Sequence, residues 1–207
     1  TGVYLNLSAA SNTAVRNNFI TGVQRDITGS TGFSAALNVG GIKVIGGNTY
    51  SIDHNSVNMF GTWAGSGNNT SDACLVIATT AQTNVNVRNN IFRNTVLGGG
   101  TGTAHCCVIL PTGGTSAMNY VQNNNAYYCA SGTNQFMAHN GFTFSAPNAF
   151  SAANFVPGST AGATNWRTYT STLSASTNND NASFGATTTV PYISDTDLHI
   201  DISSPST

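Results

Sequence analysis

The stretch V-R-N-N-F-I at Val15–Ile20 decides the fold, because the chain repeats it at a nearly constant interval. The later copies are I-D-H-N-S-V at Ile52–Val57, V-R-N-N-I-F at Val87–Phe92 and V-Q-N-N-N-A at Val121–Ala126. Each copy contributes one asparagine to a series spaced by 37, 35 and 34 residues: Asn18, Asn55, Asn90 and Asn124. A period of this length indicates a repeating structural unit.

A second apolar run keeps step with the first. Its copies are Val3–Leu7, Ala36–Val39, Cys74–Ile77 and Cys107–Leu110. Two strand-length runs in each period, separated by Gly, Thr, Ser and Asn, predict one coil of short strands. Each strand would pair with the equivalent strand one period later, and equivalent strands run in the same direction. The sequence therefore predicts an all-β fold, a parallel β-helix, with repeated coils over residues 1–134.

In such a coil the repeated asparagines would stack at one corner. Each side-chain amide could then donate a hydrogen bond to the carbonyl oxygen of the next, as in the amide ladders of stacked β structures. Asparagine also tolerates the left-handed backbone that a sharp corner requires. We interpret Asn18, Asn55, Asn90 and Asn124 as this structural ladder.

Charged side chains converge two positions before these asparagines, in the column Arg16, Asp53, Arg88 and Gln122. An aspartate between two arginines on adjacent coils predicts a cross-strand charge pair on the surface. His54, beside Asp53, is interpreted as a corner residue that replaces asparagine. The same column supplies the candidates if the chain is catalytic, namely Asp53, His54, Arg16 and Arg88.

Composition narrows the classes of function. Only 6% of the 207 residues are charged, and the net charge is −1. This near-neutral chain lacks the basic patches that bind nucleic acid or anionic membranes, and no apolar stretch reaches the ~20 residues of a membrane span. A polar, Asn/Thr/Ser-rich β protein favours an extracellular location. We also expect no signal peptide, and exposed coil ends typical of a piece of a longer protein.

The four cysteines allow two readings. Cys74 and Cys107 lie 33 residues apart and would stack on neighbouring coils, about 4.8 Å apart, which is within reach of a disulfide. A ladder of buried thiols is the alternative. Cys106 would point to the opposite face from Cys107, and its only other partner would be Cys129. The spacing of the cysteines does not suit zinc, and we expect neither a metal nor another cofactor.

Beyond residue 134 the repeat degrades, so residues 135–207 are predicted to form irregular final coils of the same domain. Residues 142–164 read as a long loop. A short helix is predicted after Asn165, which would be its N-cap. The stretch Pro191–Ile200 returns to strand chemistry and is expected to close the domain as a strand.

The ending combines a set of specific residues: Trp166, Asp180–Ser183, Pro191, Ser194, Thr196–Ile200 and Ser204-Pro205. On these residues it resembles the ending of extracellular right-handed β-helix proteins, which are common among secreted and surface proteins of Bacteroidetes-like bacteria and share a superfamily with pectate lyases. The resemblance implies a right-handed parallel β-helix of about four to six coils. It also implies that Asp197 and His199 are turn and strand residues of a structural closure. The chain departs from the family pattern at Tyr192-Ile193, where a phenylalanine is usual.

Three functions are compatible with this fold, which hosts enzymes, adhesins and stalks alike. The first is a non-catalytic extracellular structural or adhesive module of a larger surface or fibre protein. Its partners would be a cell-surface glycan, bound by Trp63, Tyr120, Tyr127 and Tyr128, or neighbouring coils of the same or another protomer. The second is a polysaccharide lyase or glycoside hydrolase, although no two acids share a column on adjacent coils. The third, an ice-binding protein, needs a regular threonine array that the chain lacks.

Overall fold

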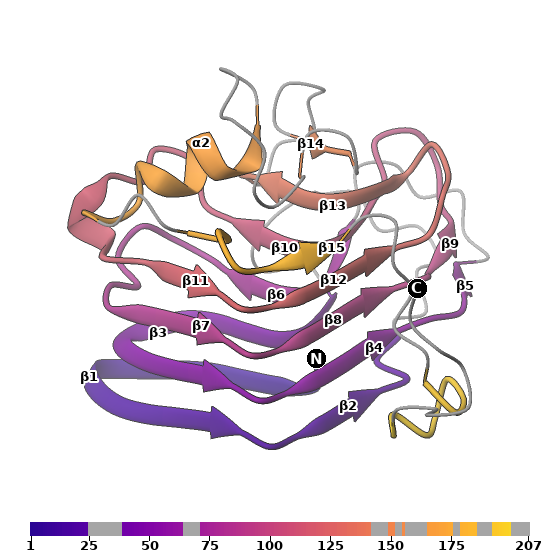
Figure 1. The fold of residues 1–207 in the computed structure, drawn as a ribbon, viewed down its shortest axis with the longest axis horizontal. Helices are drawn as coiled ribbons and strands as arrows, with labels where there is room; N and C mark the ends of the chain where they lie inside the picture. The colour runs from indigo at the N-terminus through magenta and orange to yellow at the C-terminus, as the bar shows by residue number, and fades with distance from the viewer. Residues whose placement is uncertain are drawn as a thin grey trace.

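β-Strands dominate the described part of the chain, which a computed structural model gives as residues 1–24, 39–63, 71–141, 149–151, 155, 165–175, 179–185 and 192–199. The predicted long loop, 142–164, and the final residues 200–207 lie largely outside these ranges. Three sheets account for the strands (Figure 1). The helical elements with described bounds are the 3₁₀ turn η1 (Ser116–Met118) and α2 (Trp166–Ser171), and the described residue Phe155 is also helical.

The strands divide among the sheets as follows. The first sheet contains β1 (Val3–Arg16), β3 (Val39–Asp53), β6 (Ser71–Ile77), β7 (Val85–Arg88), β10 (Ala104–Leu110), β11 (Val121–Asn123), β13 (Gln135–Asn140) and β14 (Ala149–Phe150). The second contains β2 (Phe19–Thr21), β4 (Ser56–Met59), β8 (Ile91–Asn94), β12 (Ala126–Cys129) and β15 (Phe184–Gly185). β5 (Thr62–Trp63) and β9 (Leu97–Gly98) form the third.

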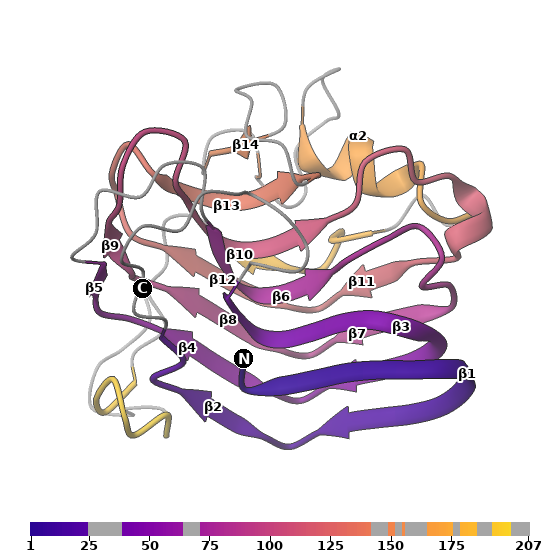
Figure 2. The same cartoon turned by 180° about the vertical axis from the view of Figure 1, so that it is seen from behind.

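Equivalent strands of successive repeats pair side by side in the same direction. In the second sheet the order is β2, β4, β8, β12 and β15, with each neighbouring pair parallel. Among the pairs that the structure describes, only β13 with β14 is antiparallel. The all-β fold with parallel pairing is confirmed. Figures 1 and 2 show the repeats lying one over another. We call them layers 1 to 5, and each layer begins with one strand of the first sheet: β1 begins layer 1, β3 layer 2, β6 layer 3, β10 layer 4 and β13 layer 5.

The core lies between the sheets and is built from columns of equivalent apolar residues. Alternation along each short strand turns every second side chain inward. In the second sheet the inward column begins with Ile20 and continues through Val57 and Phe92 to Tyr127. In the first sheet Ile42, Leu75 and Val108 are paired in register and fully buried.

One predicted repeat lies at the wrong residues. The run Ala36–Val39 does not match Cys74–Ile77, because Val39 pairs with Asp72 and the partner of Leu75 is Ile42. Residues 36–38 lie outside the described ranges. The equivalent run follows Gly40-Gly41, which hides it in the sequence. Gly41 is required there, since an added Cβ would clash with the side chain of Val57 and the backbone carbonyl of Cys74.

The asparagine column forms a directional ladder of hydrogen bonds. The backbone N–H and the side-chain amide of Asn18 both donate to Oδ1 of Asn55, over 3.2 and 2.8 Å. Asn55 donates twice to Asn90 in the same way, each time over 3.0 Å. Asn55 and Asn90 are buried, so the ladder satisfies polar groups that water cannot reach.

The fourth member is Asn125, and the prediction of Asn124 is wrong. Asn90 donates to Oδ1 of Asn125 over 3.0 Å through both its backbone and its side chain. Pairing of Ala126 with Ile91 sets this register. Asn124 instead adopts a left-handed backbone with φ of 56°, as Asn17, His54 and Asn89 do one position before each ladder residue.

The same offset moves the charged column. Gln122 pairs with Val87 and is buried, so its predicted place beside Arg88 is wrong and Asn123 lies there. Inside the stack, Gln122 accepts a hydrogen bond from the Tyr120 hydroxyl over 2.5 Å. Its side-chain amide donates to the carboxylate of Asp180.

The end of the stack beyond layer 4 is covered by α2 and an aromatic cluster. Asn165 caps α2 as predicted, accepting a hydrogen bond from the backbone N–H of Thr168 over 2.8 Å. Trp166 is fully buried, and its ring lies 5.1 Å from that of Phe150 and 6.0 Å from that of Phe155. Figures 1 and 2 show α2 and β14 together at this end, opposite β1 and β2.

The segment 192–199 folds as a tight turn rather than the predicted closing strand. The backbone N–H of Ser194 donates to Asp197 O, and that of Ile193 donates to His199 O, both over 3.1 Å. Asp197 therefore lies in a turn, as expected, whereas His199 lies outside any described strand. Asp195 ties the turn to the second sheet through an ion pair of 2.7 Å with Arg93.

Asp180 is a fully buried carboxylate under this cover. It accepts hydrogen bonds from the Tyr127 hydroxyl over 2.8 Å and from Trp166 Nε1 over 3.1 Å. Burial raises its pKa to about 6, despite these hydrogen bonds, because desolvation disfavours the charged form.

Replacing Asn90 with leucine should lower the free energy of unfolding by about 1–3 kcal/mol, because the amides of Asn55 and Asn125 would lose buried partners. Urea unfolding of both proteins measures this. Asn89→Gly is the matched control, since its exposed side chain and φ of 55° predict a change within about 0.5 kcal/mol. Equal stability of Asn90→Leu and the parent would contradict the ladder's role.

Asp180 should make the protein more stable in acid. Its pKa is higher in the folded chain than the ordinary 3.8, so its protonated form favours folding. This stabilisation is fully present below about pH 4 and is lost as the pH rises through about 6, on the order of 3 kcal/mol in all. Urea midpoints between pH 4 and 7 should therefore reveal a pH-dependent difference between the parent and Asp180→Asn.

The comparison with the Asp180→Asn variant is needed because the titration of His139 changes the stability with pH in the opposite direction. Burial lowers its pKa to about 4, so its contribution to stability is lost as the pH falls. This effect is common to both proteins and cancels in their difference. A difference that stays constant from pH 4 to 7 would show that Asp180 does not titrate in this range.

Candidate functional site

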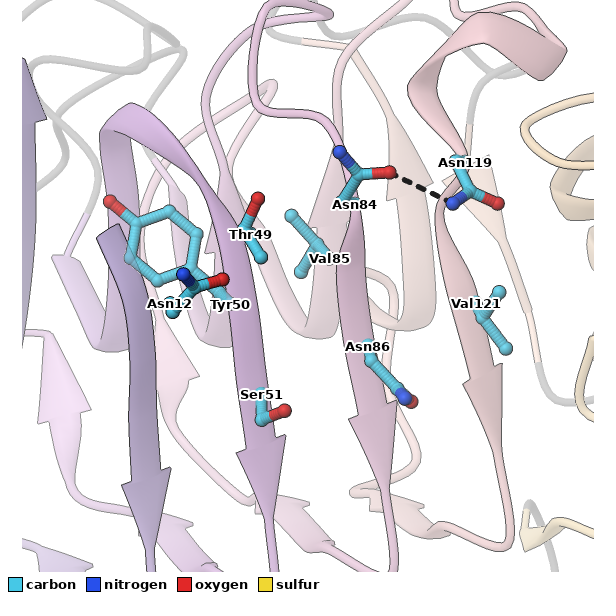
Figure 3. A pocket seen from close by; sticks show the side chains of 9 residues that line it. All are labelled: Asn12, Thr49, Tyr50, Ser51, Asn84, Val85, Asn86, Asn119 and Val121. Atoms are coloured by element: carbon cyan, nitrogen blue, oxygen red, sulfur yellow. Dashed lines mark hydrogen bonds between the residues drawn. The ribbon is translucent and has the colours of Figure 1, made fainter. Parts of the chain in front are cut away.

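A groove of about 320 Å³ runs across the outer side of β1, β3, β7 and β11, near the beginnings of the last two strands (Figure 3). Nine residues line it: Asn12, Thr49, Tyr50, Ser51, Asn84, Val85, Asn86, Asn119 and Val121. They come from four successive layers, so the groove crosses the strands rather than following one of them. None of the nine carries a charge.

The rim of the groove is a second repeated column, formed by Asn12, Thr49, Asn84 and Asn119. All four have a left-handed backbone, with φ between 44° and 63°. This conformation turns the chain into the following strand, and asparagine adopts it more readily than most residues. The side-chain amide of Asn119 donates to Oδ1 of Asn84 over 2.9 Å, which aligns the two amides along the rim.

The floor contains a polar atom that the protein leaves without a partner. Asn86 lies between Ser51 and Val121 in register. Its Oδ1 is buried and accepts no hydrogen bond from the residues that the structure describes. A buried acceptor without a donor is unfavourable by about 1–3 kcal/mol unless a ligand or water satisfies it. The groove therefore offers amide groups to a neutral, hydrogen-bonding ligand.

The charged corner lies farther along the same strands. Arg16 Nε donates to Asp53 Oδ2 over 2.9 Å, and His54 Nδ1 lies 3.2 Å from Asp53 Oδ1. The structure thus brings Arg16, Asp53 and His54 together, as the sequence predicted. Arg88 is aligned with Asp53 in the neighbouring strand, without a described ion pair to it. Both oxygens of this carboxylate are engaged, which suits a surface charge pair.

The aromatic residues predicted to bind glycan do not form a surface. Tyr120 and Tyr127 are wrong as ligand contacts, because each is at most 1% exposed. Trp63 is 8% exposed and packs edge-on against His105, with ring centroids 4.9 Å apart. Tyr128 is partly exposed on the second sheet, beneath the guanidinium of Arg93 at 5.8 Å. None of the four lines the groove.

An acid–histidine pair that sequence reasoning missed lies inside the stack. Asp72 Oδ2 is 2.6 Å from His105 Nδ1, and both side chains are at most 1% exposed. Asn94 donates to the other oxygen of Asp72 over 2.5 Å. Burial disfavours the charged imidazole, but the carboxylate outweighs it, so the pKa of His105 is raised. Both side chains are buried, so the pair belongs to the core of the stack.

The four cysteines are free thiols, so the disulfide between Cys74 and Cys107 is not formed. Pairing on either side places these two residues opposite each other in adjacent strands. Cys74 Sγ donates to the carbonyl of Arg93 over 3.2 Å, and Cys107 Sγ to that of Tyr128 over 3.1 Å. Burial raises the pKa of both thiols. They behave as packing residues of the core.

Within the described ranges, no group of three or more His, Cys or Asp side chains is placed to bind a metal ion. No helix there is long and apolar enough to span a membrane. Comparisons with protein-family models, with curated proteins and with solved structures found no match. The groove and the charged corner are therefore interpreted from their own geometry.

We expect the thiols of Cys74, Cys106 and Cys107 to be unreactive in the native protein and all four thiols to react in denaturant. Burial hides these three side chains and raises their pKa, which suppresses the reactive thiolate. Titration with a chromogenic disulfide reagent at pH 8, with and without urea, counts them. If only two thiols react in urea and four react after reduction, the chain instead contains a disulfide.

Proposed function

We propose that the chain is a right-handed parallel β-helix module of about four to six coils. In this proposal it acts outside the cell as a non-catalytic structural or adhesive part of a larger surface or fibre protein, and its groove binds neutral glycans. Parallel pairing of strands one repeat apart supports the architecture. The low content of charged residues supports an extracellular setting.

The unsatisfied Oδ1 of Asn86 carries the glycan proposal. A sugar hydroxyl is the donor that this atom lacks, and sugar hydroxyls also accept hydrogen bonds from amide groups. Asn84 and Asn119 present such amides on the rim, with Thr49 between Asn12 and Asn84. A few placed polar groups above an apolar floor are typical of small-ligand sites. Val121, which is partly exposed, supplies that apolar surface.

The direction of the groove suits an extended saccharide. Adjacent layers are about 4.8 Å apart, so equivalent amides recur at that interval along the groove. A chain of sugars laid across the strands would meet one repeat of the rim after another. The absence of charge among the nine lining residues favours neutral sugars over acidic ones.

A non-catalytic role is favoured by the arrangement of acids. Glycoside hydrolases need two carboxylates roughly 5–10 Å apart, and calcium-dependent lyases need a cluster of them. Asp53 is the one acid described in this sheet with a solvent-accessible carboxylate, since Asp72 is buried. The alternative, a polysaccharide lyase or glycoside hydrolase, is favoured by the meeting of Arg16, Asp53 and His54 within 3.2 Å.

Asn86→Ala should weaken binding of a neutral oligosaccharide about fivefold, because one hydrogen bond is worth about 1 kcal/mol. A glycan array identifies the ligand, and calorimetry on the parent and variant gives the two Kd values. Thr62→Ala, an exposed change on β5 outside the groove, should leave Kd unchanged.

Two outcomes would contradict the proposal. Failure to bind any glycan on the array would reduce the module to a spacer. Cleavage of a polysaccharide by the purified protein, abolished by Asp53→Ala, would favour the enzyme over the non-catalytic module.

A further inference from the structure

The two ends of the stack differ. α2 and the aromatic cluster around Trp166 cover the end beyond layer 4, and backbone N–H groups of Asp180 and Phe184 pair with layer 4 there. At the other end, β1 pairs only with β3 and β2 only with β4, among the strands that the structure describes. Each therefore has one strand edge that pairs with no described strand (Figures 1 and 2).

The direction of the amide ladder places a hydrogen-bond acceptor at this end of the stack. Within the ladder, the Oδ1 of Asn55 and of Asn90 each accepts two hydrogen bonds from the asparagine of the preceding layer. Oδ1 of Asn18 accepts none from the described residues. A layer placed beyond β1 and β2 would complete the pattern if it carried an asparagine at the same corner.

The side-chain amide of Asn18 also has one acceptor fewer, among the described residues, than its counterparts in the next two layers. The side-chain amide of Asn55 donates to the carbonyl of Val15 in the preceding layer over 2.9 Å. Asn90 donates in the same way to Ile52 over 2.9 Å. For Asn18 the structure describes donation to Arg16 O and Asn55 Oδ1 only. A strand carbonyl at the corresponding position of another layer would provide this acceptor for the side-chain amide of Asn18.

Charge complementarity specifies the partner further. The side chain of Arg16 is 55% exposed, and Asp53 engages its Nε alone. The guanidinium has five N–H donors, so its terminal nitrogens can bind a second carboxylate. In the column that begins with Arg16 and Asp53, an acid is the residue that would continue the alternation of charge. Two positions before an asparagine, this gives the sequence Asp-x-Asn.

The regular part of the edge is short. β1 pairs irregularly with β3 before Thr13, with register shifts after Leu5, Asn6 and Ala10. Irregular edges oppose strand addition. From Thr13 to Arg16 the pairing is regular, and β2 follows directly after the corner. Phe19, which is 59% exposed in β2, adds an apolar contact beside the ring of His199.

A second copy of this chain fits the edge poorly. A two-fold dimer would bring Arg16 against Arg16 and the acceptor of Asn18 against its own equivalent. A head-to-tail copy would have to present its opposite end, which α2 covers and where Ser183 takes the ladder position after Asn125. These conflicts favour a different layer as the partner.

We propose that the regular edge Thr13–Thr21 binds a parallel β-strand layer of another polypeptide segment that carries Asp-x-Asn at its corner. The corner asparagine donates to Oδ1 of Asn18 through its backbone N–H and side-chain amide. The aspartate pairs with Arg16. This interaction is independent of the groove and of its glycan.

The peptide Val39–Met59 is the natural probe, because it contains the corner Asp53-His54-Asn55. Added to the full chain, it should slow hydrogen exchange over residues 13–21, while residues 39–59 of the protein stay protected and so show no strand exchange. The Asn55→Leu peptide is the matched control and should bind about fivefold more weakly, since it keeps the backbone N–H donor but loses the side-chain amide donor, which is worth about 1 kcal/mol.

A double-mutant cycle tests the charge contact. The Asp53→Asn peptide should bind the parent protein two- to fivefold more weakly than the unmodified peptide, as expected for an exposed ion pair, and should show no such difference with the Arg16→Gln protein. Equal binding of the parent and Asn55→Leu peptides would overturn the proposal. So would protection confined to other residues, or a dimer of the chain alone that protects residues 13–21.

Discussion

The stacking of side-chain amides at one corner is the constraint on which the rest of the structure depends. Asn55 and Asn90 are buried, and each must find partners in the layers before and after it. This requirement fixes the register of the strands that enter and leave the corner. A slip by one residue would turn every inward side chain outward. By fixing the strand register, the ladder also determines which residues lie in the core columns, at the charged corner and on the rim of the groove.

Sequence reasoning recovered the features that identical residues mark. Asn18, Asn55 and Asn90 were found because the surrounding phrase is conserved between layers, and the pairing direction followed from their spacing. It failed where residue identity was ambiguous. Three consecutive asparagines end with Asn125, and only the strand pairing shows which one enters the ladder. In layer 2 two glycines precede the equivalent apolar run, so the sequence pattern pointed to Ala36–Val39 instead.

The groove could have been predicted in part. Asn12, Asn84 and Asn119 recur at multiples of the ladder spacing, but Thr49 replaces asparagine in the second layer. No sequence motif indicates the left-handed backbone that these four residues share. The aromatic residues were misjudged for a different reason. Tyr127 occupies an inward position of β12, and Tyr120 is buried just before β11 begins. Alternation within a three- or four-residue strand is too short to reveal this from sequence alone. The buried Asp72–His105 pair was missed although the two residues lie opposite each other in β6 and β10, because this column does not repeat one residue type.

The left-handed rim has a consequence for how such a protein could change over time. Side chain and backbone are coupled at these positions, so few residues other than asparagine, aspartate or glycine fit without strain. Duplicating one repeat would copy the bend and its amide together. If the gene gained one more repeat, the encoded protein would gain a longer ligand-contacting surface without any new substitution. The length of that surface and the number of repeats would therefore evolve together.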